Sequence, residues 1–229
     1  MAVLHDSEFG DITIRRSAQS SHVRMRVAPN GSLRVSIPAY APIFLVKRML
    51  KTNRDEIRSL FEASLPKTIF INGMQIGKSH TLYIKPSASL RAEKQKRHII
   101  LYLPHNINPS DTSVAQTLRP HIITALRTEA KSHLPKRLDW LAKQYGFTYE
   151  KVRFSHASGR WGSCSSQGTI SLNIALMKLP FELIDYVIIH ELAHTVHMNH
   201  SQDFWNLVAR ADPNYKKHRA SLRKEMPAV

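Results

Sequence analysis

Two histidines four residues apart, with a glutamate beside the first, are the residues of this chain best placed to do chemistry. They are His190, Glu191 and His194, at the start of the run HELAHTVHMNH. Residues four apart lie on the same face of a helix, so both imidazoles can bind one Zn²⁺ ion there. Glu191 can then take a proton from a water held by that ion. The spacing therefore predicts a zinc-dependent hydrolase.

The segment before this motif has the pattern of a buried helix. Pro180 suits the first helical position, and Glu182 and Asp185 follow in the early turns, near the positive end of the helix dipole. Apolar residues recur at spacings of three and four over the same stretch. A glutamate on a buried helix is costly unless it is paired or serves a metal, which favours a catalytic interpretation of Glu191 over a chance match.

A third histidine, His200, follows six residues after His194 and completes a set of three metal ligands. Three protein ligands leave the fourth position of a tetrahedral zinc to water, as a catalytic site requires. On an unbroken helix His200 would be turned about 240° away from His194, so the helix must end between them. Asn199 is the predicted left-handed residue at that end, and Ser201 is the predicted N-cap of a helix over 202–211.

Two further side chains offer other ligand sets. His197 stands where the metzincin pattern HExxHxxGxxH has glycine, which argues against a true metzincin. It could be a fourth imidazole near the metal, but we interpret it as a solvated side chain. Peptide deformylases combine HExxH with an upstream cysteine ligand, so Cys164 with His190 and His194 is a rival site. We favour His200 as the third ligand because a lone cysteine is more often a small buried thiol.

Hydrolysis of a peptide bond also needs a group that stabilises the negative charge developing on the carbonyl oxygen. A donor besides the metal is expected for this purpose. The candidates in the sequence are Tyr215, His156 and Arg160.

The segment from Ile170 to Ile174 is the candidate for binding an extended substrate. It has β character, lies just upstream of the zinc helix, and would pair with a peptide through Ser171, Leu172 and Asn173. The alternative is an internal strand with no free edge, and the sequence does not decide between the two.

Hydrophobic patterning predicts a β-rich first half and a helical second half. Short strands are expected at 12–16, 23–28 and 33–37, with a hairpin turn at Pro29-Asn30-Gly31, and a helix at 42–63. Strands follow over 68–84 and 99–103, and the basic stretch 91–98 between them reads as a solvated turn or loop. Residues 112–144 are predicted to be helical, bent or split near Pro120 and Pro135.

Composition bounds the class of protein. The 229 residues include 33 Lys and Arg against 17 Asp and Glu, a net charge of +16, with 42% hydrophobic residues. This indicates a folded globular protein with a basic surface and a possible nonspecific affinity for nucleic acid. No apolar run is long enough to span a membrane, Met1 to Gly10 lack a signal pattern, and the single cysteine excludes an internal disulfide framework. We therefore expect a cytoplasmic protein; its oligomeric state is not predicted.

Several motifs together resemble one known family. They are Arg160-Trp161-Gly162-Ser163-Cys164-Ser165, Leu172-Asn173, the HELAH run, Asn199-His200-Ser201 and Phe204-Trp205. These look like the YgjP-like metallopeptidases, which are related to the SprT-like zinc peptidases. The resemblance covers about residues 12 to 225 and is strongest from 154 onward. Some SprT-like relatives act on DNA-bound proteins. The positive charge of this chain is consistent with such a role but does not establish DNA binding.

The resemblance implies an α+β, zincin-like metallopeptidase domain in which the HExxH helix lies beside a small sheet. We expect an N-terminal tail at 1–11 and a domain at 12–225, with a β-rich portion at 12–110 and a helical catalytic portion at 111–225. It implies Zn²⁺ held by His190, His194 and His200, Glu191 as the catalytic residue, and a peptide or protein as substrate. The alternatives are a basic nucleic-acid-associated protein with a structural zinc and a deformylase-like amide hydrolase that uses Cys164.

Overall fold

The computed structural model describes residues 2–6, 8–28, 32–64, 69–157 and 159–227. The chain divides into two compact units, Met1–Thr68 and Ile69–Val229. Each unit has its own hydrophobic core.

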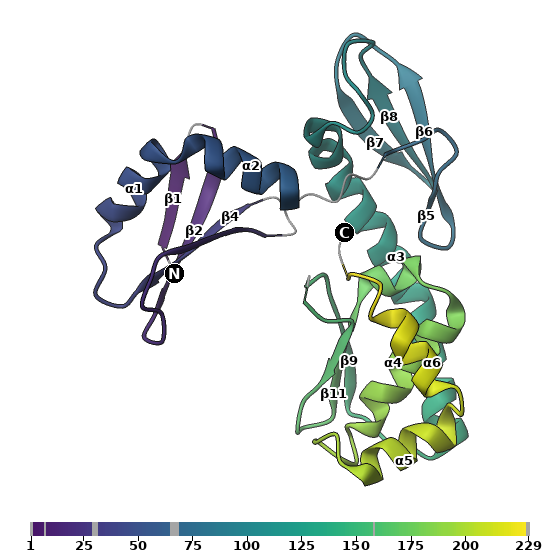
Figure 1. Cartoon of the computed structure of the whole chain (residues 1–229). Helices are drawn as coiled ribbons and strands as arrows, with labels where there is room; N and C mark the ends of the chain where they lie inside the picture. The colour runs from purple at the N-terminus through teal and green to yellow at the C-terminus, as the bar shows by residue number, and fades with distance from the viewer. Residues whose placement is uncertain (1, 7, 29–31, 65–68, 158, 228–229) are drawn as a thin grey trace. The chain divides into compact units, whose positions relative to one another are not determined.

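The first unit is a four-stranded sheet with two helices on one of its faces (Figure 1). Its described elements in chain order are β1 (Ala2–Asp6), β2 (Gly10–Ser17), β3 (Arg24–Val27), β4 (Leu33–Pro38), α1 (Ile43–Thr52) and α2 (Arg54–Ser64). The strand order is β1-β2-β4-β3, in which β2 and β4 are parallel and the two outer pairs are antiparallel. Alternate residues of β2 and β4 are buried, because one face of the sheet packs against the helices.

The structure confirms the predicted strands of the first unit and corrects the predictions for its N-terminal residues and its helix. Strands form where alternation indicated them, and β3 pairs antiparallel with β4 as a hairpin requires, although the predicted turn at 29–31 lies outside the described residues. Residues 2–6, which the sequence places in a tail, form β1 and pair with β2. The single helix predicted over 42–63 is instead two helices, because the chain leaves the helical path at Asn53.

The second unit contains two sheets, one at each end of a long helix (Figure 1). Its described elements are β5 (Gln75–Ile76), β6 (His80–Pro86), β7 (Arg91–Gln95), β8 (His98–Leu103), α3 (Thr112–Tyr145), β9 (Lys151–Ser155), β10 (Gly162–Cys164), β11 (Thr169–Asn173), the 3-10 helix η1 (Ile174–Lys178), α4 (Phe181–Ala193), α5 (Gln202–Ala211) and α6 (Tyr215–Leu222). The first sheet has the order β5-β6-β8-β7 and the second the order β10-β11-β9. Strands β6 and β8 share one core with α3, α4 and α5, so the strands between residues 75 and 103 are not separate from the helical part.

The prediction of a loop over Arg91–His98 is wrong. Residues 91–95 form β7, which pairs antiparallel with β8 and turns back at Lys96, where φ is +51°. A strand can form from these charged residues because β7 lies at the edge of its sheet, where side chains can reach solvent or a neighbouring side chain. The Arg91 guanidinium lies 3.5 Å from the centre of the Tyr102 ring, and the Tyr102 hydroxyl donates to Glu93 at 2.8 Å.

Helix α3 runs without a break through Pro120 and Pro135, where the sequence predicts a bend or a split. A proline removes one backbone hydrogen bond from a helix and crowds the preceding turn. Buried residues on both sides of each proline, including Leu118, Ala125, Leu134 and Leu138, pack into the core of the unit. Tertiary packing therefore keeps the helix continuous where local propensity opposes it.

A buried carboxylate on α3 holds the turn between β5 and β6. Glu129 accepts hydrogen bonds from the backbone nitrogens of Lys78 and Ser79 at 2.6 and 2.8 Å and from the Ser79 hydroxyl at 2.9 Å; the other partner is His80 Nδ1 at 2.6 Å. Gly77 has φ +71°, and a Cβ there would lie 2.3 Å from Glu129 Oε2. Burial raises the pKa of Glu129, but these hydrogen bonds outweigh burial and leave the pKa below its usual value of 4.5.

We expect Glu129→Gln to lower the free energy of unfolding near neutral pH by about 1–3 kcal/mol, because an amide cannot accept all of these bonds. A pKa depressed by folding stabilises the protein above the unfolded-state value and ceases to do so as the pH falls through the folded-state value. The difference between wild type and variant should therefore shrink below about pH 4.5. Urea unfolding at several pH values measures it, with exposed Glu182→Gln as the control. Equal losses in the two variants near neutral pH would contradict this account.

Candidate metal centre

Helix α4 carries His190 and Glu191 in its last turn. Most of the helix is buried, so the motif is held by the core of the second unit; its buried apolar residues are Leu183, Ile184, Tyr186, Val187, Ile188, Ile189, Leu192 and Ala193. The helix ends at Ala193, and His194 is its C-cap residue with helical φ and ψ. His190 and His194 therefore remain one turn apart on the same face, as their spacing predicts.

The chain leaves the helix immediately after the second histidine. Thr195 N donates to Leu192 O at 3.0 Å and Val196 N donates to Ala193 O at 3.1 Å, so the last turn tightens to bonds between residues three apart. The Thr195 hydroxyl also donates to Leu192 O at 2.7 Å. The prediction that Asn199 ends the helix in a left-handed conformation is wrong, since Lys96 is the non-glycine residue with positive φ among those described.

The second predicted helix after the motif is confirmed. Its N-cap is Ser201, whose side chain accepts a hydrogen bond from Phe204 N at 3.4 Å, and α5 covers Gln202–Ala211 as predicted. The turn at 194–200 and this cap return the chain toward α4 and bring His200 back over the first two histidines.

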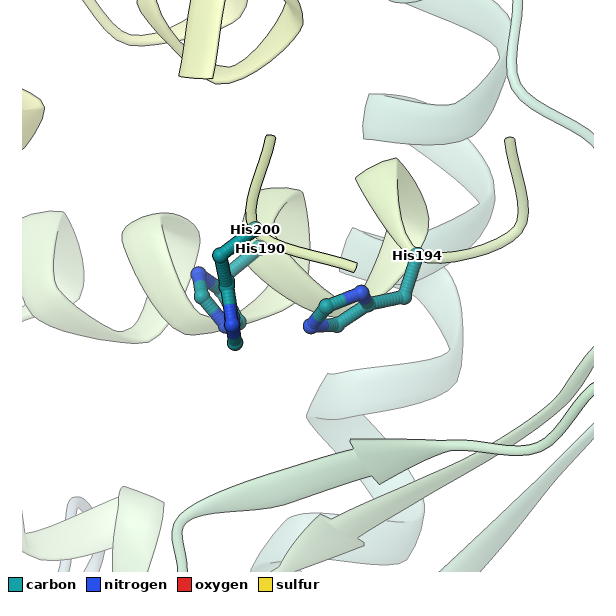
Figure 2. Close-up of side chains that lie close together, drawn as sticks. All are labelled: His190, His194 and His200. Atoms are coloured by element: carbon teal, nitrogen blue, oxygen red, sulfur yellow. The ribbon is translucent and has the colours of Figure 1, made fainter. Parts of the chain in front are cut away.

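The three imidazoles converge (Figure 2). One ring nitrogen from each of His190, His194 and His200 lies within 4.8 Å of the others, and the ring centres are 4.8–5.1 Å apart. His190 Nε2 and His200 Nε2 are 3.2 Å apart. Two nitrogens bound to one tetrahedral zinc stand about 3.3 Å apart, given Zn–N bonds of about 2.0–2.1 Å. The donor set and the spacing of His190 and His200 therefore fit a zinc ion.

The protonation of these rings suits metal binding. Burial, followed by the neighbouring imidazoles and Arg219, lowers the pKa of His190 to about 3, and burial also lowers the pKa of His194. Neutral imidazole is the form that binds a metal. His194 Nδ1 lies 3.0 Å from His197 O, a contact in which Nδ1–H donates and Nε2 is left for the ion. The backbone carbonyl of His197 thus orients the His194 ring, while the His197 ring is outside the group of convergent nitrogens.

Aromatic residues support the histidine cluster. Phe204 is fully buried, and its ring centre lies 4.5–5.0 Å from those of all three histidines. Trp205 stacks on His200 at 5.6 Å, and Tyr215 stacks on Trp205 at 5.5 Å. His200 is exposed, so this stack orients a ring that the core does not enclose.

Glu191 is buried beside the cluster. Its residue is 5% exposed, and burial raises the pKa of its carboxyl to about 8, with the charge of Arg160 acting in the opposite direction. Within the part of the chain that the structure describes, no residue hydrogen-bonds this carboxylate. A carboxylate left free in this way can accept a proton from water or substrate.

Gly162, the first residue of β10, is a site residue that the sequence interpretation misses. A Cβ at this position would lie 2.6 Å from Glu191 Oε1 and 2.7 Å from Glu191 Cγ. The structure needs a glycine here because strand β10 closely approaches the Glu191 side chain. A single sequence carries no signal for this contact because the two residues are 29 positions apart.

Of the two alternatives that the sequence leaves open for Ser171, Leu172 and Asn173, the structure shows the internal strand and not the free edge. They lie in β11, which is the central strand of its sheet and is paired on both sides. Leu172 and Asn173 are fully buried. The Asn173 amide donates to Ala157 O at 2.6 Å and to Arg160 O at 2.9 Å, so its role is to hold the segment that leads into β10. The edge strand on this side is β10.

The three candidates for charge stabilisation occupy different places. Arg160 acts electrostatically on Glu191, as its effect on that pKa shows. Tyr215 stacks on Trp205, which in turn stacks on His200. His156 Nδ1 lies 3.2 Å from an Arg127 nitrogen on α3 and has no described contact with the cluster.

Cys164 does not belong to the convergent group. It lies at the end of β10, half-buried, with its thiol 3.4 Å from Ser165 O. Burial, followed by the charge of Glu191, raises the pKa of this thiol, which disfavours the thiolate that a metal would bind. Among the described residues the convergent ligand set is the three histidines.

A small cavity lies next to Glu191. Its volume is about 180 Å³, and it is lined by Trp161, Gly162, Tyr186, Val187, His190, Glu191 and Leu222. Apart from His190, Glu191 and the glycine, these are apolar or aromatic side chains.

A helix-borne histidine pair, a third histidine and a buried glutamate beside a small sheet are together typical of a metallopeptidase. The chain matches the family model described as YgjP-like, metallopeptidase domain, over residues 21–225, and it belongs to that family. It is therefore a metallopeptidase with a mixed α+β, zincin-like fold, and its family implies a metal. This confirms the class that the sequence motifs predict.

Two solved structures are similar to parts of the chain. One is the metallopeptidase zymogen of Pyrococcus abyssi abylysin, 28% identical over 39% of this chain and 92% of that one, with a TM-score of 0.36. The other is the metallopeptidase zymogen of Methanocaldococcus jannaschii jannalysin, 18% identical over 39% and 93%, with a TM-score of 0.35. The curated proteins include none that matches. The family match carries the assignment.

No helix among the described residues combines the length and the apolar character needed to cross a bilayer.

Proposed function

We propose that the protein hydrolyses peptide bonds with a Zn²⁺ ion held by His190, His194 and His200. The observation that carries this proposal is the convergence of three imidazole nitrogens beside a buried glutamate, Glu191. When bound, zinc would acidify a water and polarise the carbonyl of the substrate.

The other steps fall to side chains of the chain itself. Glu191 takes the proton from the attacking water at its carboxylate and passes it to the nitrogen of the leaving amine. Its burial favours both transfers because a raised pKa makes the carboxylate a stronger base and keeps its proton available near neutral pH. Gly162 leaves space for this carboxylate, and the positive charge of Arg160 favours its ionised form.

The substrate is an extended peptide with an apolar side chain next to the scissile bond. Strand β10 ends the sheet beside Glu191, and its outer edge offers backbone groups to which an extended chain can pair. The cavity next to Glu191 would take the adjacent side chain, and Trp161, Val187 and Leu222 favour an apolar one.

Replacing Leu222 with Lys should lower kcat/KM about tenfold or more for peptides with a large apolar residue beside the cleaved bond, because a charge then stands in the cavity wall. Metal content should not change. Ala220→Lys adds the same charge on the exposed side of α6 and serves as the control. Cleavage assays on a peptide library measure both variants. An unaltered substrate preference in Leu222→Lys would show that this cavity does not bind the substrate side chain.

Removal and return of the metal test the proposal as a whole. The purified protein should contain about one zinc per chain, lose peptidase activity when a chelator removes it, and recover when zinc is added back. Replacing His190 or His194 with Ala should abolish binding. Absence of a bound metal in active protein would overturn the proposal.

The two alternative functions would give different results in the activity and metal-removal experiments. A basic nucleic-acid-associated protein with a structural zinc would bind DNA and show no hydrolysis under any condition, and a deformylase-like enzyme would need Cys164. The net charge of +16 supports an affinity for nucleic acid, which is compatible with peptidase activity. The cytoplasmic location and the boundaries at residues 11 and 110 stay predictions.

A further inference from the structure

Four arginines share the open face of the sheet in the first unit. Helices α1 and α2 cover the other face, where alternate residues of β2, β3 and β4 point into the core. The residues between them therefore point away from the helices. The exposed arginines on this side are Arg15 on β2, Arg24 and Arg26 on β3, and Arg34 on β4.

Strand register places these arginines in two adjacent rows. Arg26 is directly opposite Arg34 in the antiparallel pair of β3 and β4. Arg24 is opposite Ser36, whose neighbour on the far side is Arg15. Neighbouring strands are about 4.8 Å apart, and residues two apart on a strand are separated by about 6.7 Å.

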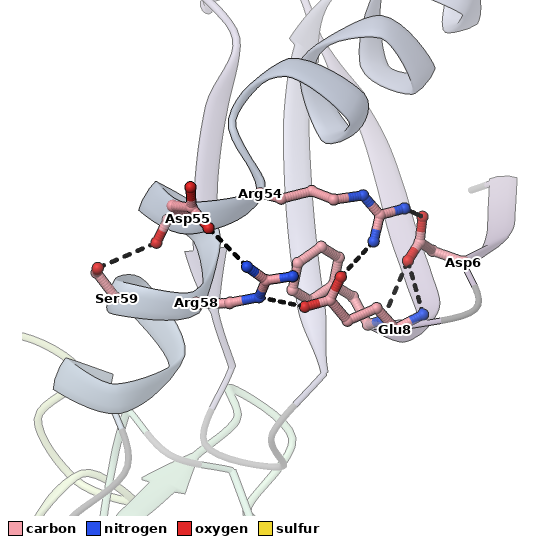
Figure 3. Close-up of polar contacts among 7 residues, drawn as sticks. Asp6, Glu8, Arg54, Asp55, Arg58 and Ser59 are labelled. Atoms are coloured by element: carbon pink, nitrogen blue, oxygen red, sulfur yellow. Dashed lines mark hydrogen bonds and ion pairs between the residues drawn. The ribbon is translucent and has the colours of Figure 1, made fainter.

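The arginines of this face are not taken up in ion pairs with acidic residues that the structure describes. In the described part of the chain none of the four forms an ion pair. By contrast, both arginines of α2 form ion pairs in one cluster (Figure 3). Arg54 pairs with Asp6 and Glu8, and Arg58 pairs with Glu8 and Asp55. The arginines of the open face and those of α2 therefore have different roles.

One carboxylate, Asp11, shares the open face. It lies two residues before Thr13, the cross-strand partner of Arg34, so it is a diagonal neighbour of Arg34, but the ion pair described for it is with His5. Its Oδ1 is 2.9 Å from Nδ1 of His5, and both side chains are more than three-quarters exposed (78% and 77%). Two like charges facing each other across a sheet destabilise it. Arg26 and Arg34 thus impose a cost that the first unit does not need for folding, because its core lies on the other face.

We propose that this arginine face binds the phosphate backbone of nucleic acid. A polyanion would relieve the Arg26–Arg34 repulsion, and a guanidinium can bind a phosphate through two parallel hydrogen bonds. The separation of about 6.7 Å along β3 is close to the rise of two nucleotides, at about 3.4 Å each on one strand. Contacts of this kind carry no sequence information, so the binding is nonspecific in sequence.

The test uses the full chain and fluorescence anisotropy with labelled DNA of roughly twenty nucleotides, single- and double-stranded, at several salt concentrations. The variant Arg24→Gln/Arg26→Gln/Arg34→Gln removes three charges from the open face. The control Lys47→Gln/Arg48→Gln/Lys51→Gln removes three exposed charges from α1, on the other side of the sheet. Both variants have the same net charge.

We expect the open-face variant to bind about tenfold more weakly or worse, and its slope of log K against log salt to fall by about 2–3. The control should lose less than about threefold and keep its slope. Equal losses in the two variants would overturn the proposal, as would binding of phosphatidylserine vesicles without binding of DNA. A single Arg34→Gln variant, expected to reduce the slope by about 1, repeats the test if the triple variant does not fold.

This proposal stands apart from the peptidase proposal. Cleavage of a short peptide should be the same in wild type and in all of these variants, because the open face belongs to the first unit and the histidine cluster to the second. Loss of DNA binding with peptidase activity retained is the expected pattern.

Discussion

Glu191→Gln should lower kcat/KM for a peptide substrate by about 10²–10⁴-fold while the zinc content stays the same. Glutamine keeps the size of the side chain but cannot take a proton from water or return it to the leaving amine. The carboxylate has no hydrogen-bond partner among the described residues, so the substitution breaks no contact that holds the fold. Parallel measurements of peptide cleavage and of metal by atomic spectroscopy test this.

Glu182→Gln is the matched control for this experiment, since Glu182 is exposed at the other end of the same helix. It should leave both activity and metal content unchanged. If Glu191→Gln retained wild-type activity, Glu191 would not be the base, and if it lost the metal, its role would be structural.

Gly162→Ala should lower activity about 10–100-fold without releasing the metal. The added Cβ would come within 2.6–2.8 Å of three atoms of the Glu191 side chain, so the carboxylate has to move. Displacing a catalytic group by about 1 Å can cost about 10²-fold in rate. Cleavage rate and zinc content of the purified variant measure the effect.

Gly159→Ala is the control for this substitution. Gly159 lies in the same segment, its φ is outside the left-handed region, and a Cβ there would meet open space. It should behave as wild type. If Gly162→Ala were also fully active, the close approach of β10 to Glu191 would have no part in catalysis.

Features set by neighbours in the sequence were predicted well. The helix spacing of His190 and His194, the N-cap at Ser201 and the bounds of α5 follow from local periodicity and capping. The requirement that the chain turn back before His200 also follows from helix geometry alone. The structure brings the three rings together, and their binding of a metal stays a prediction.

Features set by distant partners were missed. The contact of Gly162 with Glu191, the central place of β11 and the pairing of β7 with β8 depend on which strands meet in the folded chain. Asn199 is a suitable helix terminator by residue type. Helix α4 nevertheless ends earlier, at Ala193, where the Thr195 hydroxyl and the tightened backbone hydrogen bonds satisfy its last carbonyl groups. Local sequence signals do not contain this information.

X-ray absorption at the zinc edge of the purified protein tests the central claim most directly. We predict three imidazole nitrogens at about 2.0–2.1 Å with one further oxygen, and the loss of one nitrogen in His200→Ala. A sulfur ligand at about 2.3 Å, or a spectrum that His200→Ala leaves unchanged, would contradict the assignment of His200 as the third ligand.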